Sequence, residues 1–154
     1  MSNLWTPPSL SGDNVFWGTS LAAAISAPVD NINHYLGVNS GATTTAPTAA
    51  SPTTPLVKRA CTITEVYFTI VVAGTNGTAE TGTLFVRVNN TTDFTVVNNT
   101  LAWNVGATGA THSVTGLSIS LVPGDFWTLK IDPPTWATNP TNVFYVGQTV
   151  LTFP

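Results

Sequence analysis

Few residues in this 154-residue chain can act as a nucleophile or a base. The single cysteine, Cys61, and the two histidines, His34 and His112, are far apart in sequence, so a Cys–His pair would depend on the fold. Ser113 follows His112 directly, and neighbours on a strand point to opposite faces. The sequence also lacks a nucleophile elbow of the Gly-x-Ser-x-Gly type. We therefore expect Cys61 to be a small buried thiol and the chain to have no catalytic residues.

The carboxylates show no spacing that indicates paired-acid catalysis or a metal site. A glycosidase needs two facing carboxylates, and a calcium loop needs several acids around a glycine. The turn at residues 89–93 has one acid, and neither histidine has a partner at zinc-ligand spacing. We expect no enzyme activity, no metal and no cofactor. The seven acids are Asp13, Asp30, Glu65, Glu80, Asp93, Asp125 and Asp132.

Trp136 lies in a polar loop together with Asn139 and Asn142. An exposed indole face flanked by amides can stack on a sugar and hydrogen-bond its hydroxyl groups. A glycan contact by these three residues is one interpretation. In the other, Trp136 folds back as a lid over the end of the domain. Trp103 and Trp127 lie among apolar strand residues, and we expect both in the core.

The composition excludes several classes of partner. Charged residues make up only 7% of the chain, and four Lys and Arg side chains cannot neutralise a run of phosphates, so we expect no nucleic acid. No apolar run is long enough to cross a membrane, and the first residues do not resemble a secretory signal. Polarity comes instead from 28 threonines and 13 asparagines. Low surface charge removes a guard against association, so we expect the chain to pack against copies of itself or a larger lattice.

Residues 56–154 carry the alternating apolar pattern of β-strands. The sequence Val122-Pro-Gly-Asp125 predicts a type II turn, because proline fits its second position and glycine its third. Seven or eight short strands predict an all-β, jelly-roll-like antiparallel β-sandwich. The strands are expected near residues 66–72, 84–88, 117–121, 127–131 and 143–153. Residues 94–97 and 100–104 predict either two short strands or one interrupted strand.

The first third of the chain has a different composition and lacks this alternating pattern. Residues 1–38 are interpreted as an extended N-terminal arm, and residues 39–55 as a low-complexity Thr/Ala/Pro linker to a domain over residues 56–154. Within the arm, residues 21–25 predict one or two helical turns that end before Pro28. The arm's large apolar residues either cap their own domain or anchor in neighbouring subunits. These interface candidates are Leu4, Trp5, Phe16, Trp17, Tyr35 and Leu36.

Four segments in fixed order carry a resemblance: PLVKRACTITEVYFTIVVAG, GTLFVRVNNTTD, HSVTGLSISLVPGDFWTLKI and NPTNVFYVGQTVLTF. Their order resembles the compact jelly-roll domains of bacteriophage virion proteins, such as capsid decoration proteins and tail-fibre tips. These domains are similar in outline to C1q and tumour-necrosis-factor domains, and Gly124-Asp125 matches their turn between sheets. The resemblance covers residues 56–153 and implies homotrimers about a threefold axis. The first 55 residues match no pattern.

These observations lead to one functional hypothesis and two alternatives. We expect a structural virion protein, a trimeric decoration (cement) protein that is assembled in the host cytoplasm and binds the major capsid protein. The arm is the expected attachment element. Deleting residues 1–38 should then abolish particle binding and leave the β domain folded. The alternatives are a receptor-binding or tail-fibre tip that recognises glycan, and an unspecialised β domain.

Overall fold

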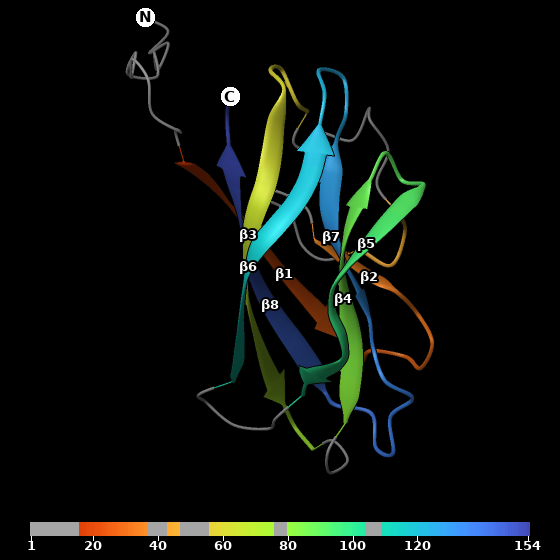
Figure 1. Ribbon diagram of the computed structural model, residues 1–154. Coiled ribbons are helices and arrows are strands. Elements are labelled where there is room, and N and C mark those ends of the chain that lie inside the picture. Colours follow the sequence, from red (N-terminus) through yellow and green to blue (C-terminus); the bar gives the residue numbers. More distant parts are fainter. Residues whose placement is uncertain (1–15, 37–42, 47–55, 76–79, 104–108) are drawn as a thin grey trace, which may run out of the picture.

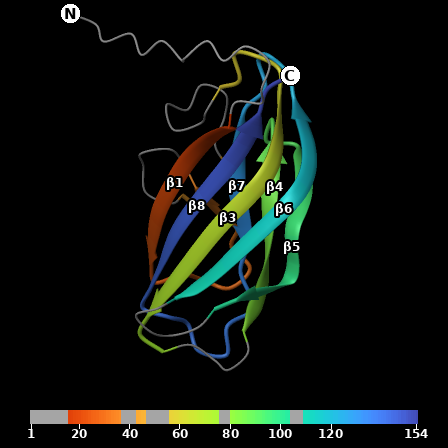
Figure 2. The same ribbon diagram turned by 60° about the vertical axis from the view of Figure 1, so that its left-hand side comes forward.

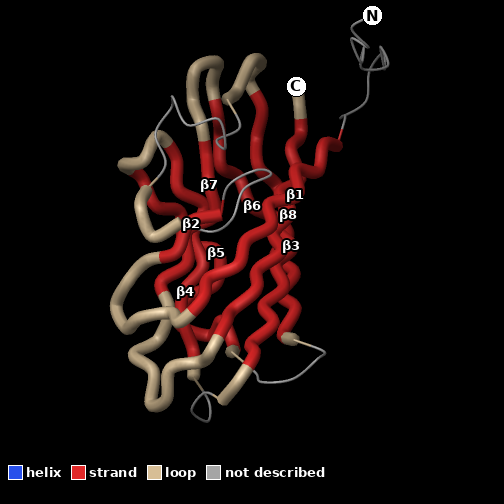
Figure 3. Tube along the Cα trace, turned by 180° about the vertical axis from the view of Figure 1, so that it is seen from behind, coloured by secondary structure: helices blue, strands red, loops and turns tan. Residues whose placement is uncertain are grey.

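The computed structural model describes residues 16–36, 43–46, 56–75, 80–103 and 109–154. The described residues form eight strands in two four-stranded antiparallel sheets that pack face to face (Figure 1). Figure 3 shows only strands and loops in this part of the chain. Within it, no helix is long and apolar enough to cross a membrane. The strands are β1 (Phe16–Ser26), β2 (His34–Leu36), β3 (Cys61–Ala73), β4 (Thr81–Val88), β5 (Thr92–Ala102), β6 (Ala110–Leu121), β7 (Trp127–Asp132) and β8 (Asn142–Thr152).

The strand order confirms the predicted sandwich. One sheet has the order β1-β8-β3-β6 and the other the order β2-β7-β4-β5. Figure 2 shows the first sheet with its four strands in this order. Apart from the hairpin between β4 and β5, each strand is followed along the chain by a strand of the opposite sheet. Eight strands that cross between two sheets in this way form a jelly roll.

The core lies between the sheets and follows from the alternation of side chains. Phe68, Ile70 and Val72 of β3 point inward and are buried. They belong to one apolar cluster with Leu84 of β4 and Leu129 of β7, in the opposite sheet. Each such side chain contributes about 1.5–3 kcal/mol when it is fully buried, so sheet-on-sheet packing is the main stabilising term.

Three predictions about buried residues and turns are confirmed. Trp103 and Trp127 are core residues, and Cys61 is buried. The turn before β7 has Gly124 at a φ of 99°, a region that favours glycine. The Asp125 amide closes this turn by donating to the Val122 carbonyl at 3.0 Å.

The predicted helical turns at residues 21–25 are wrong, because this segment lies within β1. β1 pairs with β8 without interruption, from Phe16 opposite Thr152 to Ser26 opposite Asn142. A helix of five residues is unstable alone, because its first turn costs more than its few hydrogen bonds return. The long edge of β8 supplies backbone partners along the whole segment, and this outweighs the helix preference of three alanines.

The β-sandwich begins earlier in the chain than the expected domain boundary at residue 56. β1 and β2 both lie in residues 1–38, the expected arm, and each forms the edge of one sheet. Deleting residues 1–38 would therefore remove an edge strand from both sheets, which disagrees with the expectation that the β domain stays intact. Residues 1–15, 37–42 and 47–55 lie outside the described residues.

Candidate functional site

Trp136 is buried, so the structure contradicts a glycan-stacking role and supports the lid interpretation. Only 5% of the residue is exposed, and its ring meets that of Trp103 edge-on at a centroid distance of 4.8 Å. Its backbone N–H donates to Asp30 Oδ1 at 3.0 Å. Asn139 is exposed but donates to the Pro28 carbonyl at 3.0 Å, and Asn142 opens β8. Trp136 and Asn139 therefore hold the loop onto its own domain.

The interface candidates fall into three groups. Tyr35 and Leu36 are 7% and 1% exposed, so within this chain they pack against their own domain. Phe16 and Trp17 lie in β1, opposite Thr152 and Leu151. The remaining candidates, Leu4 and Trp5, lie outside the described residues.

The titratable candidates are separated. Cys61 begins β3 opposite Leu121, whereas His112 lies opposite Phe68. Seven residues of strand separate these two levels, roughly 20 Å. His34 is in the other sheet, opposite Ile131. In the described part of the chain, no group of three or more His, Cys, Asp and Glu side chains is placed to hold a metal ion.

Burial shifts the pKa of each of these groups in the direction that favours the neutral form. Burial lowers the pKa of His34 to about 4. Burial also lowers the pKa of His112. It raises the pKa of the Cys61 thiol, and the negative charge of Asp125 raises it further. A buried thiol with a raised pKa is a poor nucleophile, because the thiolate is the reactive form.

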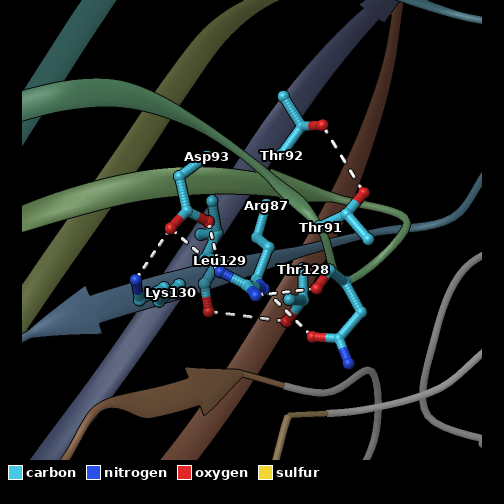
Figure 4. Close-up of polar contacts among 8 residues, drawn as sticks. Arg87, Thr91, Thr92, Asp93, Thr128, Leu129 and Lys130 are labelled. Carbon is cyan, nitrogen blue, oxygen red and sulfur yellow. Dashed lines mark hydrogen bonds and ion pairs between the residues drawn. The ribbon is translucent and has the colours of Figure 1, made fainter.

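The outer face of the second sheet carries a network of charges (Figure 4). Asp93 of β5 accepts from Arg87 Nη1 at 2.7 Å and from Lys130 Nζ at 2.8 Å. Arg87 also donates to the Asn90 carbonyl at 2.7 Å, and Lys130 Nζ lies 4.8 Å from the centroid of the Phe85 ring. The network ties the β4–β5 hairpin to β7. It uses two of the four basic residues of the chain.

The outer face of the first sheet is nearly uncharged and exposes several apolar side chains. β8 exposes Phe144 and Val146 at 44% and 54%, and β3 exposes Tyr67 at 38%. Val71 lies opposite Phe144, Thr69 opposite Val146, and Tyr67 opposite Gln148, so these side chains form a continuous strip across two strands. We call Tyr67, Thr69, Val71, Phe144 and Val146 the neutral face.

One acid borders the neutral face. Glu65 is the only Asp, Glu, Lys or Arg in β1, β8, β3 and β6. The Tyr67 hydroxyl donates a hydrogen bond to its carboxylate. Exposed apolar strips of this kind mark interaction surfaces, and charged residues are depleted at the centres of protein interfaces. The neutral face is therefore suited to bind another flat protein surface.

The neutral face is not among the sites predicted from the sequence. Its signal is the run Val143-Phe-Tyr-Val146, in which apolar residues occupy both faces of a strand. An antiparallel strand with one face open to water usually alternates apolar and polar residues, and this run does not. In this chain the inner side chains Val143 and Tyr145 are buried, whereas Phe144 and Val146 are exposed. The exposed pair offers apolar surface that another molecule can cover.

No family model and no curated protein matches the sequence. Among solved structures, the chain is similar to one in the "Cyanophage Pam1 capsid asymmetric unit", with a TM-score of 0.46 and 14% sequence identity. The match covers 97% of this chain and 92% of that chain. A likeness of this size identifies neither the family nor the function of the chain.

Proposed function

We propose that the chain is a structural protein of a bacteriophage virion, a decoration (cement) protein that binds the assembled capsid as a homotrimer. The observation that carries the proposal is the neutral face, which exposes Phe144, Val146 and Tyr67 beside a single acid, Glu65. The kind of assembly comes from the resemblance of residues 56–153 to virion jelly-roll domains. The proposed partner is the major capsid protein.

The neutral face would act by burying apolar surface at about 25 cal/mol per Å² against the shell. Because the protein would bind the assembled shell and not its free subunits, it would stabilise the shell by mass action. A homotrimer presents the same contact three times, so three weak contacts add up to tight attachment. The proposal assigns the chain no catalytic step.

Salt dependence is a first signature of this mechanism. The outer face of the first sheet has one charged side chain, Glu65. Salt screens contacts between exposed charges and leaves apolar burial in place. Attachment through the neutral face should therefore change little between low and physiological salt.

The decisive test substitutes Val146 by arginine and measures copies bound per particle on undecorated capsids of the source phage. Val146 is 54% exposed, so Val146→Arg should leave the fold intact. It should lower occupancy at least tenfold, because a desolvated, unpaired charge is placed inside the contact. The matched control is Val122→Arg, at a residue that is 57% exposed in the turn before β7.

Two results would contradict the proposal at different levels. If Val146→Arg decorates particles at wild-type occupancy, the neutral face is not the attachment surface. If the wild-type chain binds no capsid, the decoration role itself is wrong.

A further inference from the structure

An apolar pocket of about 500 Å³ opens at the end of the sandwich where β3 begins and β8 ends. Its apolar walls come from both sheets, with Trp127 from β7 and Leu151 from β8, and from the flanking residues Leu56 and Phe153. Lys58 and Arg59 line the same pocket. Its volume lies in the range of ligand-binding pockets.

The lining of this pocket indicates what would fill it. Trp127 is only 3% exposed, and its indole Nε1 is itself closed to solvent. An occupant therefore meets the apolar side chains of the pocket and not the indole N–H. A peptide segment with large apolar side chains fits such a lining.

The pocket's rim is held in place by the chain end. Arg59 Nη2 donates to the Pro154 carbonyl at 2.7 Å, and its guanidinium lies 5.8 Å from the Phe153 ring centroid. With Lys58, the rim carries two of the four basic residues of the chain. An occupant with Lys or Arg side chains would be repelled there.

The segment that precedes β1 contains apolar side chains that suit this pocket, and it joins the domain beside the pocket. β1 begins at Phe16, opposite Thr152, and Thr152 is next to the pocket residue Phe153. Residues 1–15, which we call the leading segment, contain Leu4 and Trp5 and no Lys or Arg. Aromatic anchors of this kind dominate binding where they enter pockets.

The length of the leading segment favours the pocket of another copy over the chain's own pocket. From Trp5 to Phe16, an extended chain spans up to about 36–40 Å. The chain's own pocket lies beside the point where β1 begins, so the segment would have to double back to enter it. A second copy is reached without this return.

We infer that the pocket at Trp127 receives Leu4 and Trp5 from the leading segment of a neighbouring copy. Copies of the chain are then linked by arm exchange. This inference does not rest on the virion role, because it needs only copies of the chain.

The first experiment measures binding of a labelled synthetic peptide, residues 1–15, to the full-length Trp5→Ala chain by fluorescence anisotropy. We expect saturable binding, at least tenfold weaker to a receptor that also carries Leu56→Glu. Leu56 is 42% exposed and lines the pocket, so it tolerates a polar side chain. The matched control is Val29→Glu, at a residue that is 60% exposed and does not line the pocket. No binding, or equal binding to the Leu56→Glu receptor, overturns the inference.

The second experiment separates exchange between copies from docking within one copy. A full-length chain with Trp5→p-benzoylphenylalanine is irradiated, and the crosslinked peptides are mapped. A covalent dimer joined near residues 56–59 supports the inference. A crosslink to the same residues within a single chain overturns it, as does a crosslink elsewhere. Capsid binding by the Trp5→Ala chain, measured separately, reports on the decoration role alone.

Discussion

His34 is a polar side chain held inside the sandwich by one partner. It is fully buried, and its Nδ1 lies 2.6 Å from the hydroxyl of Tyr145 in the opposite sheet. Burial raises the pKa of Tyr145 well above its ordinary value, so the phenol remains protonated. Burial also lowers the pKa of His34, so the imidazole is neutral at pH 7. The pair is a neutral hydrogen bond that joins β2 to β8.

This burial makes the stability of the fold sensitive to acid. The pKa of His34 is about 4 in the folded chain against 6.5 for the free side chain. The unfolded state therefore binds more protons between these values, and stability falls as pH drops from 6.5 to 4. The loss from His34 is at most about 3 kcal/mol. We expect the free energy of unfolding, measured in urea across this range, to fall more steeply for wild type than for His34→Gln.

The comparison with His34→Gln isolates this residue from the other titrating groups. The pKa of His112 is also lowered by burial, and that of Asp125 by hydrogen bonds from Asn89 and the Val122 amide. Both are present in both chains, so their effects cancel. Parallel curves for wild type and His34→Gln would show that His34 does not titrate in this window.

The burial of a tryptophan could be predicted where its neighbours in the sequence determine it. Trp103 and Trp127 are flanked by strand residues, and both are in the core as expected. Trp136 is flanked by polar residues, yet it is buried because Trp103 meets its ring and Asp30 accepts from its amide. Those partners are far away in sequence, so the local pattern left both an exposed indole and a lid over the domain open.

At the level of elements, alternation predicted the strands after residue 56 and failed before it. In β3 and β4 buried positions alternate with mostly half-buried ones, and this pattern is visible in the sequence. β1 contains three consecutive alanines, whose preference is helical. Its strand conformation comes from pairing with β8, more than a hundred residues later, which no local pattern contains.

The register between β4 and β7 leaves no room for a side chain at Gly82. A Cβ there would lie 2.4 Å from the Asp132 carbonyl oxygen, which belongs to the backbone of β7. Gly82→Ala should therefore push the two strands apart and cost about 1–3 kcal/mol. The measurement is the midpoint of urea unfolding.

Gly147→Ala is the matched comparison for Gly82→Ala. Its Cβ would lie 2.4 Å from Leu129 Cδ1, which is the end of a side chain and not part of the backbone. We expect a smaller loss for this variant than for Gly82→Ala. An equal or larger loss would mean that the β4–β7 backbone adjusts more easily than the packed core does.

At the level of the whole molecule, the two outer faces have different characters. The second sheet carries the Arg87–Asp93–Lys130 network, whereas the first has one acid beside the neutral face. A sandwich with one charged face and one neutral face is suited to sit on a surface with one side and face solvent with the other. This difference cannot be predicted from overall composition, because it depends on which strands share a sheet.

The sheet order predicts where the chain can be shortened. A chain of residues 16–154 contains all eight described strands, and we expect it to fold and to melt in one cooperative transition. A chain of residues 39–154 lacks β1 and β2, so β8 and β7 become the sheet edges. The new β8 edge would leave its backbone groups unpaired next to Phe144 and Val146, which favours aggregation. It would also remove His34, the partner of Tyr145.

We therefore expect the shorter chain to melt at a lower temperature by circular dichroism and to aggregate by light scattering. Equal melting of both chains would place the start of the domain after residue 38 and make β1 and β2 dispensable additions to a six-stranded core.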